Sequence, residues 1–157
     1  MKPSNSPPEQ DYLRRVNVRL MLAEERERLD GLLETRHYLH SARVGGQSLR
    51  YIAKVDGQWV ALMVFSGAAP HTKARESEIG WTARQRARRL CFVVNNSRFL
   101  VLPERQKYPN LASRVLGLCL KRLNADWQER WGHPVVLVES YVDESQYRGT
   151  CLPGLWF

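Results

Sequence analysis

The sequence has no long apolar run. No window of the 157 residues approaches the roughly 18 consecutive apolar residues that a membrane-spanning helix needs. The first ten residues, rich in proline and serine, also lack the apolar stretch of a secretory signal peptide. We therefore expect a cytoplasmic protein with no membrane partner, in which residues 1–10 form an unstructured tail and residues 11–157 form one domain.

Cysteine is scarce, with Cys91, Cys119 and Cys151 widely spaced and in no C-x-x-C pair. This pattern argues against a disulfide framework and against a zinc site. Cys91 and Cys119 lie among apolar residues, and we expect both to be buried free thiols. His37 and His40 stand at helical spacing, but the sequence offers no evident third ligand, so we expect no metal there.

Acidic residues are almost absent from residues 82–122. This segment holds ten lysines and arginines against the single acid Glu104, whereas the whole chain has a net charge of +8. A positive field this concentrated attracts polyanions, and arginine suits bidentate contact with phosphate. We expect nucleic acid, in the first place DNA, as the partner; a solvated helix face is the alternative. The expected contacts are Trp81, Arg84, Arg86, Arg88, Arg89, Arg98, Arg105 and Lys107.

The N-terminal half predicts a helix followed by a β-hairpin. Apolar residues recur at helical spacing over residues 11–34, which predicts a helix interrupted near Gly31. Residues 48–55 and 59–65 are rich in aliphatic and aromatic side chains and flank Asp56-Gly57, a strong signal for a two-residue turn. We expect these two segments to form antiparallel strands.

A helix start opens the basic segment, after a polar loop. Thr82 and Gln85 have the spacing of a capping box, in which each side chain accepts a hydrogen bond from the other residue's backbone N–H. The predicted helix runs to Asn95-Asn96, residues that tolerate the left-handed conformation at helix ends. The alternative is a hairpin that turns at Asn95-Asn96, because residues 91–94 are also typical of a strand.

The C-terminal third predicts a strand, a long helix and a second strand. Residues 99–102 form a short buried strand, and the helix begins after Asn110 and ends at Gly132. Residues 135–142 are a nearly continuous apolar run, typical of a strand buried on both faces of a parallel or mixed sheet. This order predicts a right-handed crossover in a three-layer α/β fold with a mixed sheet.

Two candidate sites follow from this arrangement. The amino end of the long helix would present free backbone N–H groups to an anion such as phosphate, although a plain capped helix start is the alternative. Its expected residues are Asn110, Leu111, Ala112, Ser113 and Arg114. Glu139 and Asp143 share one face of the last strand and could act as a base or share a divalent metal. The alternative for Glu139 is an ion pair with an arginine.

Several peptides of the chain resemble a known family. The sequence reads Val-Asn-Asn-Ser-Arg-Phe-Leu-Val-Leu-Pro over residues 94–103, Pro-Asn-Leu-Ala-Ser over 109–113 and Leu-Val-Glu-Ser-Tyr-Val-Asp over 137–143. Together with shorter matches over residues 37–151, this order resembles the DruA-like family of Druantia anti-phage systems, whose relatives also occur beside transposase-type proteins. The resemblance implies a role in anti-phage defence or mobile DNA, with other components of such systems as partners.

Two departures from the family pattern suggest a member truncated at its C-terminus. Glu104 stands where members typically have tryptophan, and the residues after Cys151 differ from the family's tail. The expected order of elements also resembles an acyl-CoA N-acyltransferase core, in which the long helix's amino end holds the cofactor pyrophosphate. We expect a DNA-associated accessory domain, and its DNA binding would require no cofactor. The alternatives are an N-acyltransferase-like enzyme that uses acetyl-CoA and a magnesium-dependent nuclease centred on Glu139 and Asp143.

Overall fold

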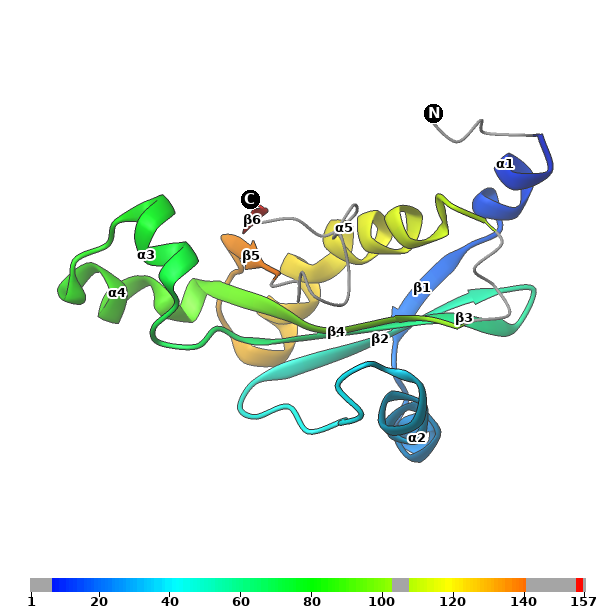
Figure 1. Cartoon of the computed structure of the whole chain (residues 1–157), viewed down its shortest axis with the longest axis horizontal. Coiled ribbons are helices and arrows are strands. Elements are labelled where there is room, and N and C mark those ends of the chain that lie inside the picture. The colour runs from blue at the N-terminus through cyan, green and yellow to red at the C-terminus, as the bar shows by residue number, and fades with distance from the viewer. Residues whose placement is uncertain (1–6, 103–107, 141–154, 157) are drawn as a thin grey trace.

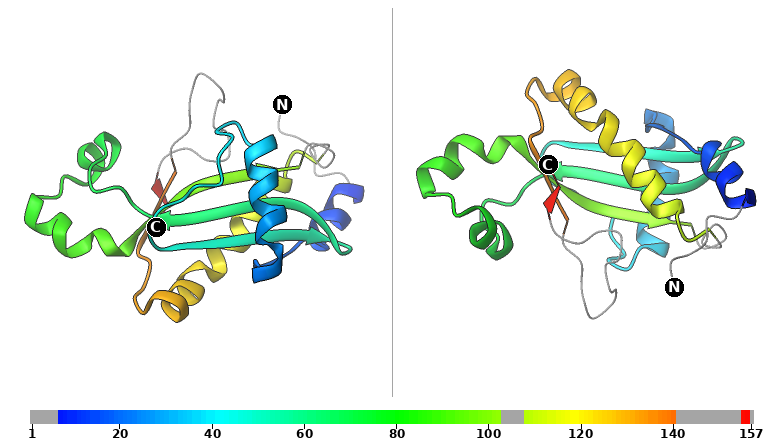
Figure 2. Two further views of the ribbon diagram at one scale, coloured as in Figure 1. Left: turned by 90° about the horizontal axis from the view of Figure 1, so that it is seen from below. Right: turned by 90° about the horizontal axis from the view of Figure 1, so that it is seen from above.

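A six-stranded mixed sheet forms the centre of the molecule, with helices on both faces (Figures 1 and 2). The computed structural model describes residues 7–102, 108–140 and 155–156. The strands follow chain order across the sheet, and every neighbouring pair is antiparallel except β4 and β5, which are parallel. The elements are α1 (Pro7–Arg14), β1 (Asn17–Leu20), η1 (Ala23–Glu25), α2 (Arg26–Arg36), β2 (Ser48–Val55), β3 (Gln58–Gly67), α3 (Lys73–Ile79), α4 (Ala83–Arg89), η2 (Leu90–Phe92), β4 (Val93–Val101), α5 (Leu111–Trp131), β5 (Leu137–Glu139) and β6 (Leu155–Trp156).

The predicted hairpin is confirmed as β2 and β3. Asp56 and Gly57 form its turn with φ angles of 50° and 79°. Two consecutive left-handed residues are what a two-residue turn of type I′ requires, and the twist of that turn matches the twist of the strands it joins. The two strands lie inside the sheet, and β3 is buried at every residue from Trp59 to Ser66.

The single helix predicted over residues 11–34 is wrong. Helix α1 ends at Arg14, and β1 then pairs antiparallel with β2 before α2 begins. Val18 and Leu20 pack against the core that α5 covers. Their spacing of two residues is that of a strand. Pairing with β2 therefore outweighs the 3.6-residue helical period that the sequence also shows in this segment. Gly31 lies inside α2 rather than at an interruption, and residues 7–10, expected in an unstructured tail, belong to α1.

The helix predicted from Thr82 to Asn96 is also too long. Its start is confirmed, because Gln85 donates its backbone N–H to Thr82 Oγ1 at 3.2 Å and Thr82 donates its own to Gln85 Oε1 at 3.0 Å. The helix ends at Arg89, and Asn95 and Asn96 lie within β4 instead of forming a turn. Strand β4 lies between β3 and β5, so this apolar segment forms backbone hydrogen bonds on both sides.

One helix was not predicted at all. The segment expected to be a polar loop contains α3, which Thr72 caps by accepting the backbone N–H of Arg75 at 3.4 Å. Gly80, with φ of 69°, ends it in the left-handed conformation. Helix α3 has too few apolar residues to show a helical period, so its sequence carried only the capping signals.

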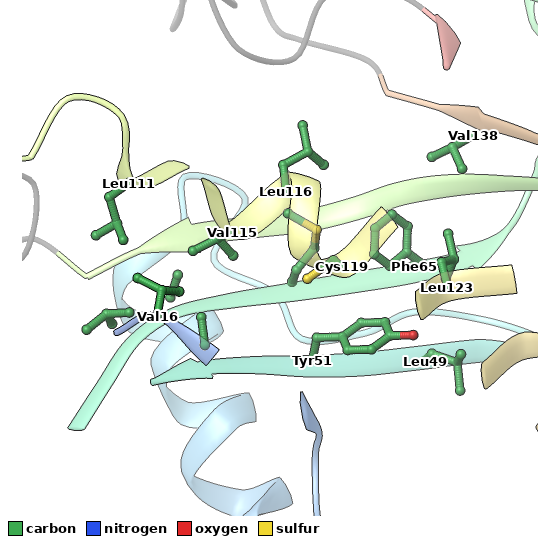
Figure 3. Packing of buried hydrophobic residues seen from close by; sticks show 14 of the residues in the cluster. Val16, Leu49, Tyr51, Phe65, Leu111, Val115, Leu116, Cys119, Leu123 and Val138 are labelled. Carbon is green, nitrogen blue, oxygen red and sulfur yellow. The ribbon is translucent and has the colours of Figure 1, made fainter. Parts of the chain in front are cut away.

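The core has two layers, one on each face of the sheet. Helix α5 packs Val115, Cys119, Leu123 and Trp127 against one face, where Tyr51 and Phe65 of the central strands meet them (Figure 3). Helix α2 covers the other face, and its two core residues are fully buried. Cys119 is therefore buried as expected, whereas the prediction for Cys91 is wrong, since η2 leaves that thiol exposed.

The predicted crossover is confirmed, because β4, α5 and the parallel strand β5 follow one another in the chain. Helix α5 spans Leu111–Trp131 and ends at Gly132 with φ of 78°. Strand β5 is shorter than the predicted run, and residues 141–142 lie outside the described residues. The α/β mixed-sheet fold class is thus confirmed. No helix in the described part of the chain is long and apolar enough to cross a membrane.

Two glycine substitutions test these assignments, because one is expected to stabilise the protein and the other to destabilise it. A Cβ at Gly31 meets nothing within 4 Å, so Gly31→Ala is expected to stabilise α2 by about 0.5–1 kcal/mol. A Cβ at Gly57 also meets nothing, but the φ of 79° should make Gly57→Ala destabilising by about 1–2 kcal/mol. Urea unfolding of both variants measures the difference. A destabilising Gly31→Ala would contradict a continuous α2.

Candidate functional site

An insertion between β3 and β4 carries the most concentrated positive charge among the described residues. Residues 68–92, here termed the arginine arm, contain α3 and α4 and extend beyond one end of the sheet (Figures 1 and 2). The seven residues of α4 include four arginines and no acid. Six of these seven residues are exposed, and only Arg86 is half-buried. The arm therefore presents a basic helix that buries none of its side chains.

The four arginines of α4 differ in their surroundings. Arg86 Nη1 lies 3.8 Å from Glu76 Oε1, so this side chain braces α4 against α3. Arg84, Arg88 and Arg89 are exposed, and the described residues provide no acidic partner for them. These three predicted nucleic-acid contacts are brought together on one short helix, and their charge faces solvent.

A buried ion pair joins the arm to the sheet. Arg75 of α3 is 2% exposed and Glu139 of β5 is fully buried. The guanidinium donates to both carboxylate oxygens, through Nε to Oε1 and through Nη2 to Oε2, the latter at 2.9 Å. It also donates to the carbonyls of Ala69 at 2.7 Å and Pro70 at 3.3 Å. Arg75 thus ties the start of the arm to a strand that follows it by more than sixty residues in the chain.

Glu139 was predicted as a catalytic residue, and the arrangement matches the alternative of an arginine partner. Both oxygens accept hydrogen bonds from Arg75, and the side chain has no exposed surface. Such a carboxylate is not open to a metal ion or a substrate. Asp143 lies outside the described residues. Among the residues that are described, no group of three or more His, Cys, Asp or Glu side chains could hold a metal.

Polar residues form a row across four strands beside this pair, which the sequence did not reveal. Ser48 pairs in register with Ser66, Ser66 with Asn95, and Asn95 with Glu139. Residues in register share one face of a sheet, so the row is continuous. Ser66 also hydrogen-bonds to Ser97. These residues lie on four different strands, and only the pairing of the strands brings them together.

Arg98, another predicted nucleic-acid contact, has a structural role. Its guanidinium donates to the carbonyls of Ser41 at 2.8 Å, Ser97 at 2.7 Å and Arg43 at 3.1 Å. Partial burial lowers its pKa below the ordinary value. These bonds hold the segment that follows α2 against the sheet. Trp81, half-buried, precedes α4, while Arg105 and Lys107 lie outside the described residues.

The amino end of α5 already holds an anionic group of the chain itself. Glu9 of α1 is 3% exposed, and its Oε1 accepts from the Asn110 backbone N–H at 3.0 Å and from Asn110 Nδ2 at 3.2 Å. Asn110 stands at the predicted N-cap position, although its side chain makes no capping bond. Arg114 donates to the carbonyl of Leu13 at 3.2 Å, and Leu111 is fully buried. A pyrophosphate here would meet a like charge, so these residues do not fit acetyl-CoA.

Among the described residues, His37 is a buried histidine whose pKa is strongly lowered. His37 is 3% exposed, and its Nδ1 accepts the Leu39 backbone N–H at 3.2 Å. Burial first, and then the nearby charge of Arg98, lower its pKa from 6.5 to about 4. His40 is exposed, and its Nδ1 contacts the carbonyl of Glu34 at 3.0 Å. The two rings therefore differ in burial and in hydrogen-bond partner.

The buried His37 predicts a pH dependence of stability. Its folded pKa lies below its unfolded value, so the unfolded chain takes up the proton first and stability falls as the pH drops from 6.5 towards 4. Between pH 6.5 and 5 the loss should be about 2 kcal/mol. Urea unfolding across this range should show a smaller loss of unfolding free energy for His37→Gln than for the wild-type protein. Equal losses for both proteins would contradict this role of the histidine.

The Arg75–Glu139 pair predicts strongly non-additive mutations. Glu139→Met leaves a buried guanidinium without its counter-charge and should cost about 3–5 kcal/mol. The double variant Arg75→Met/Glu139→Met should be less destabilised than that single variant. Asp11→Asn, which breaks the exposed pair between Asp11 and Arg15, is the control and should change stability by under about 0.5 kcal/mol. Additive losses in the double variant would show that the pair is not coupled.

The arrangement of the chain is similar to that of a solved enzyme. The crystal structure of a ribosomal-protein-alanine N-acetyltransferase from Brucella melitensis biovar Abortus 2308 matches with a TM-score of 0.45 and 14% sequence identity. The match covers 90% of this chain and 94% of that enzyme. No curated protein matches the sequence.

The sequence also matches a family model over most of its length. The model is described as Druantia protein DruA and covers residues 4–150. This range includes β4 and β5, which carry parts of the peptides at 94–103 and 137–143, and the parallel pairing of these strands places Val94 beside Val138 and Asn95 beside Glu139. The family points to an anti-phage defence system, as the sequence predicted. The chain therefore belongs to the DruA family of Druantia proteins.

Proposed function

We propose that this chain is a DNA-associated accessory domain of an anti-phage defence system. In this proposal, Arg84, Arg88 and Arg89 of α4 bind DNA phosphates. The observation that supports it is the composition and exposure of α4, in which four of seven residues are arginine, none is acidic and none is buried. An association with transposase-type proteins remains a prediction from the family resemblance.

The charge of α4 is not needed for the stability of the fold. A helix that buries no side chain gains nothing from the core, and an isolated helix of two turns is marginal in water. The capping box at Thr82 and the contact of Arg86 with Glu76 hold it in place. Arg84, Arg88 and Arg89 have no acidic partner among the described residues, so their charges repel one another, and phosphate groups would relieve that repulsion. A polyanion is thus the partner whose charge best complements this surface.

The buried ion pair at the start of the arm supports the same proposal. Arg75 fixes α3 to β5, because its guanidinium donates two hydrogen bonds to the Glu139 carboxylate and one each to the carbonyls of Ala69 and Pro70. A binding element that is ordered before it meets its partner loses less conformational entropy on association. The Arg75–Glu139 pair therefore serves DNA binding by positioning the arm, without itself contacting the nucleic acid.

Removal of the three exposed arginines tests the proposal. We expect Arg84→Gln/Arg88→Gln/Arg89→Gln to weaken binding to a 20-base-pair duplex by at least about tenfold at low salt. The slope of log affinity against log salt concentration should fall by about 2–3, because each lost phosphate contact releases about one counterion fewer. Fluorescence anisotropy from 50 to 200 mM salt measures both quantities.

The matched control removes the same charge elsewhere. Arg14, Arg43 and Lys121 are exposed and lie outside the arm, so Arg14→Gln/Arg43→Gln/Lys121→Gln should retain the salt slope of the wild type. Equal losses in both triple variants would assign binding to net charge instead of to α4. Absence of any binding by the wild-type protein would overturn the proposed function.

A further inference from the structure

We infer that α4 binds in the major groove of duplex DNA, an inference that rests on the proposed function and specifies its partner. Every residue of α4 except Arg86 is exposed, and the helix runs from the outer end of the arm back towards β4 (Figures 1 and 2). Neither α5 nor α2 stands between it and an approaching duplex in these views. The sides of the helix away from Arg86 are therefore available to a partner.

The arginines occupy two sides of this helix. Successive residues of an α-helix are separated by about 100°, which places Arg88 about 40° and Arg89 about 140° from Arg84 around the axis. Gln85, also exposed, falls between Arg88 and Arg89 at about 100°. Arg86, at about 200°, lies on the side that faces Glu76 of α3. The positive charge thus flanks an uncharged line on the exposed side of α4.

This distribution matches a groove with a phosphate backbone on each side. An α-helix with its side chains is about 10–12 Å across, and the major groove of B-form DNA is about 12 Å wide. With α4 in that groove, Arg84 and Arg88 would contact one backbone and Arg89 the other, while Gln85 faces the base edges. The minor groove, about 6 Å wide, is too narrow for a helix.

The same geometry excludes duplex RNA as an equivalent partner for α4. The major groove of A-form RNA is deep and narrow, so side chains do not reach into it. If the arginines bound phosphates only from outside the duplex, DNA and RNA of the same charge would bind alike. A preference for duplex DNA over duplex RNA is therefore a measurable consequence of groove insertion.

A competition experiment tests whether α4 binds in the major groove. The full chain is titrated by fluorescence anisotropy against a 20-base-pair DNA duplex, the RNA duplex of the same sequence and the single DNA strand. We expect the DNA duplex to bind at least about tenfold more tightly than the RNA duplex. Methyl green, which occupies the major groove, should displace the protein, and netropsin, which occupies the minor groove, should not.

A second pair of variants separates the effect of the helical structure of α4 from the effect of its charge. Ala87→Pro keeps every arginine but breaks α4, because proline removes a backbone N–H and clashes with the preceding turn. It should abolish the preference for DNA over RNA, while Ala87→Ser, the control at the same exposed position, should retain it. Thermal unfolding of both variants should remain close to the wild type, since α4 buries no side chain.

The failures of the two proposals are distinguishable. Equal affinity for the DNA and RNA duplexes, or displacement by netropsin alone, would overturn groove insertion while the arginine-dependent salt slope still supports phosphate binding. Retention of the full DNA preference by Ala87→Pro would overturn it as well. If the wild-type protein binds none of the three nucleic acids, the proposed function fails and the groove inference fails with it.

Discussion

The buried pair between Arg75 and Glu139 is the interaction on which the position of the proposed binding surface depends. The two side chains are nearly inaccessible to solvent, so neither charge is tolerable without the other. Glu139 is fixed in turn by the parallel pairing of β5 with β4, where it stands in register with Asn95. One ion pair therefore links the long-range order of the sheet to the position of an inserted arm whose helices contribute little to the core.

The chain thus has one part that supplies the hydrophobic core and another part, the arm, that we propose to bind DNA. The two apolar layers under α5 and α2 supply the stability that comes from burial, whereas α4 supplies almost none. A helix released from packing constraints can accumulate like charges that the core would not accept. The arm can therefore concentrate arginine at little cost to the fold, because its anchor lies in α3 and its exposed charge lies in α4.

The amino end of α5 shows how tertiary contacts redirect a general property of helices. A long helix attracts anions to its first turn, and the sequence predicted phosphate there. In the folded chain, α1 places the buried carboxylate of Glu9 against Asn110, so the helix dipole is used to hold the N-terminal helix on the domain. In our proposal, the basic charge that meets an external polyanion lies instead on the arm, which precedes β4 in the sequence.

The sequence by itself determined the features that depend on neighbouring residues. The Asp56-Gly57 turn, the capping box at Thr82 and the long apolar stripe of α5 are local signals, and each was predicted correctly. Only the tertiary structure decided between helix and strand at β1 and at the start of β4, because strand pairing outweighs a weak helical period. It also decided the partners of Arg75, Glu139 and Glu9, since buried charges choose counter-charges by proximity in space, which these sequence patterns do not encode.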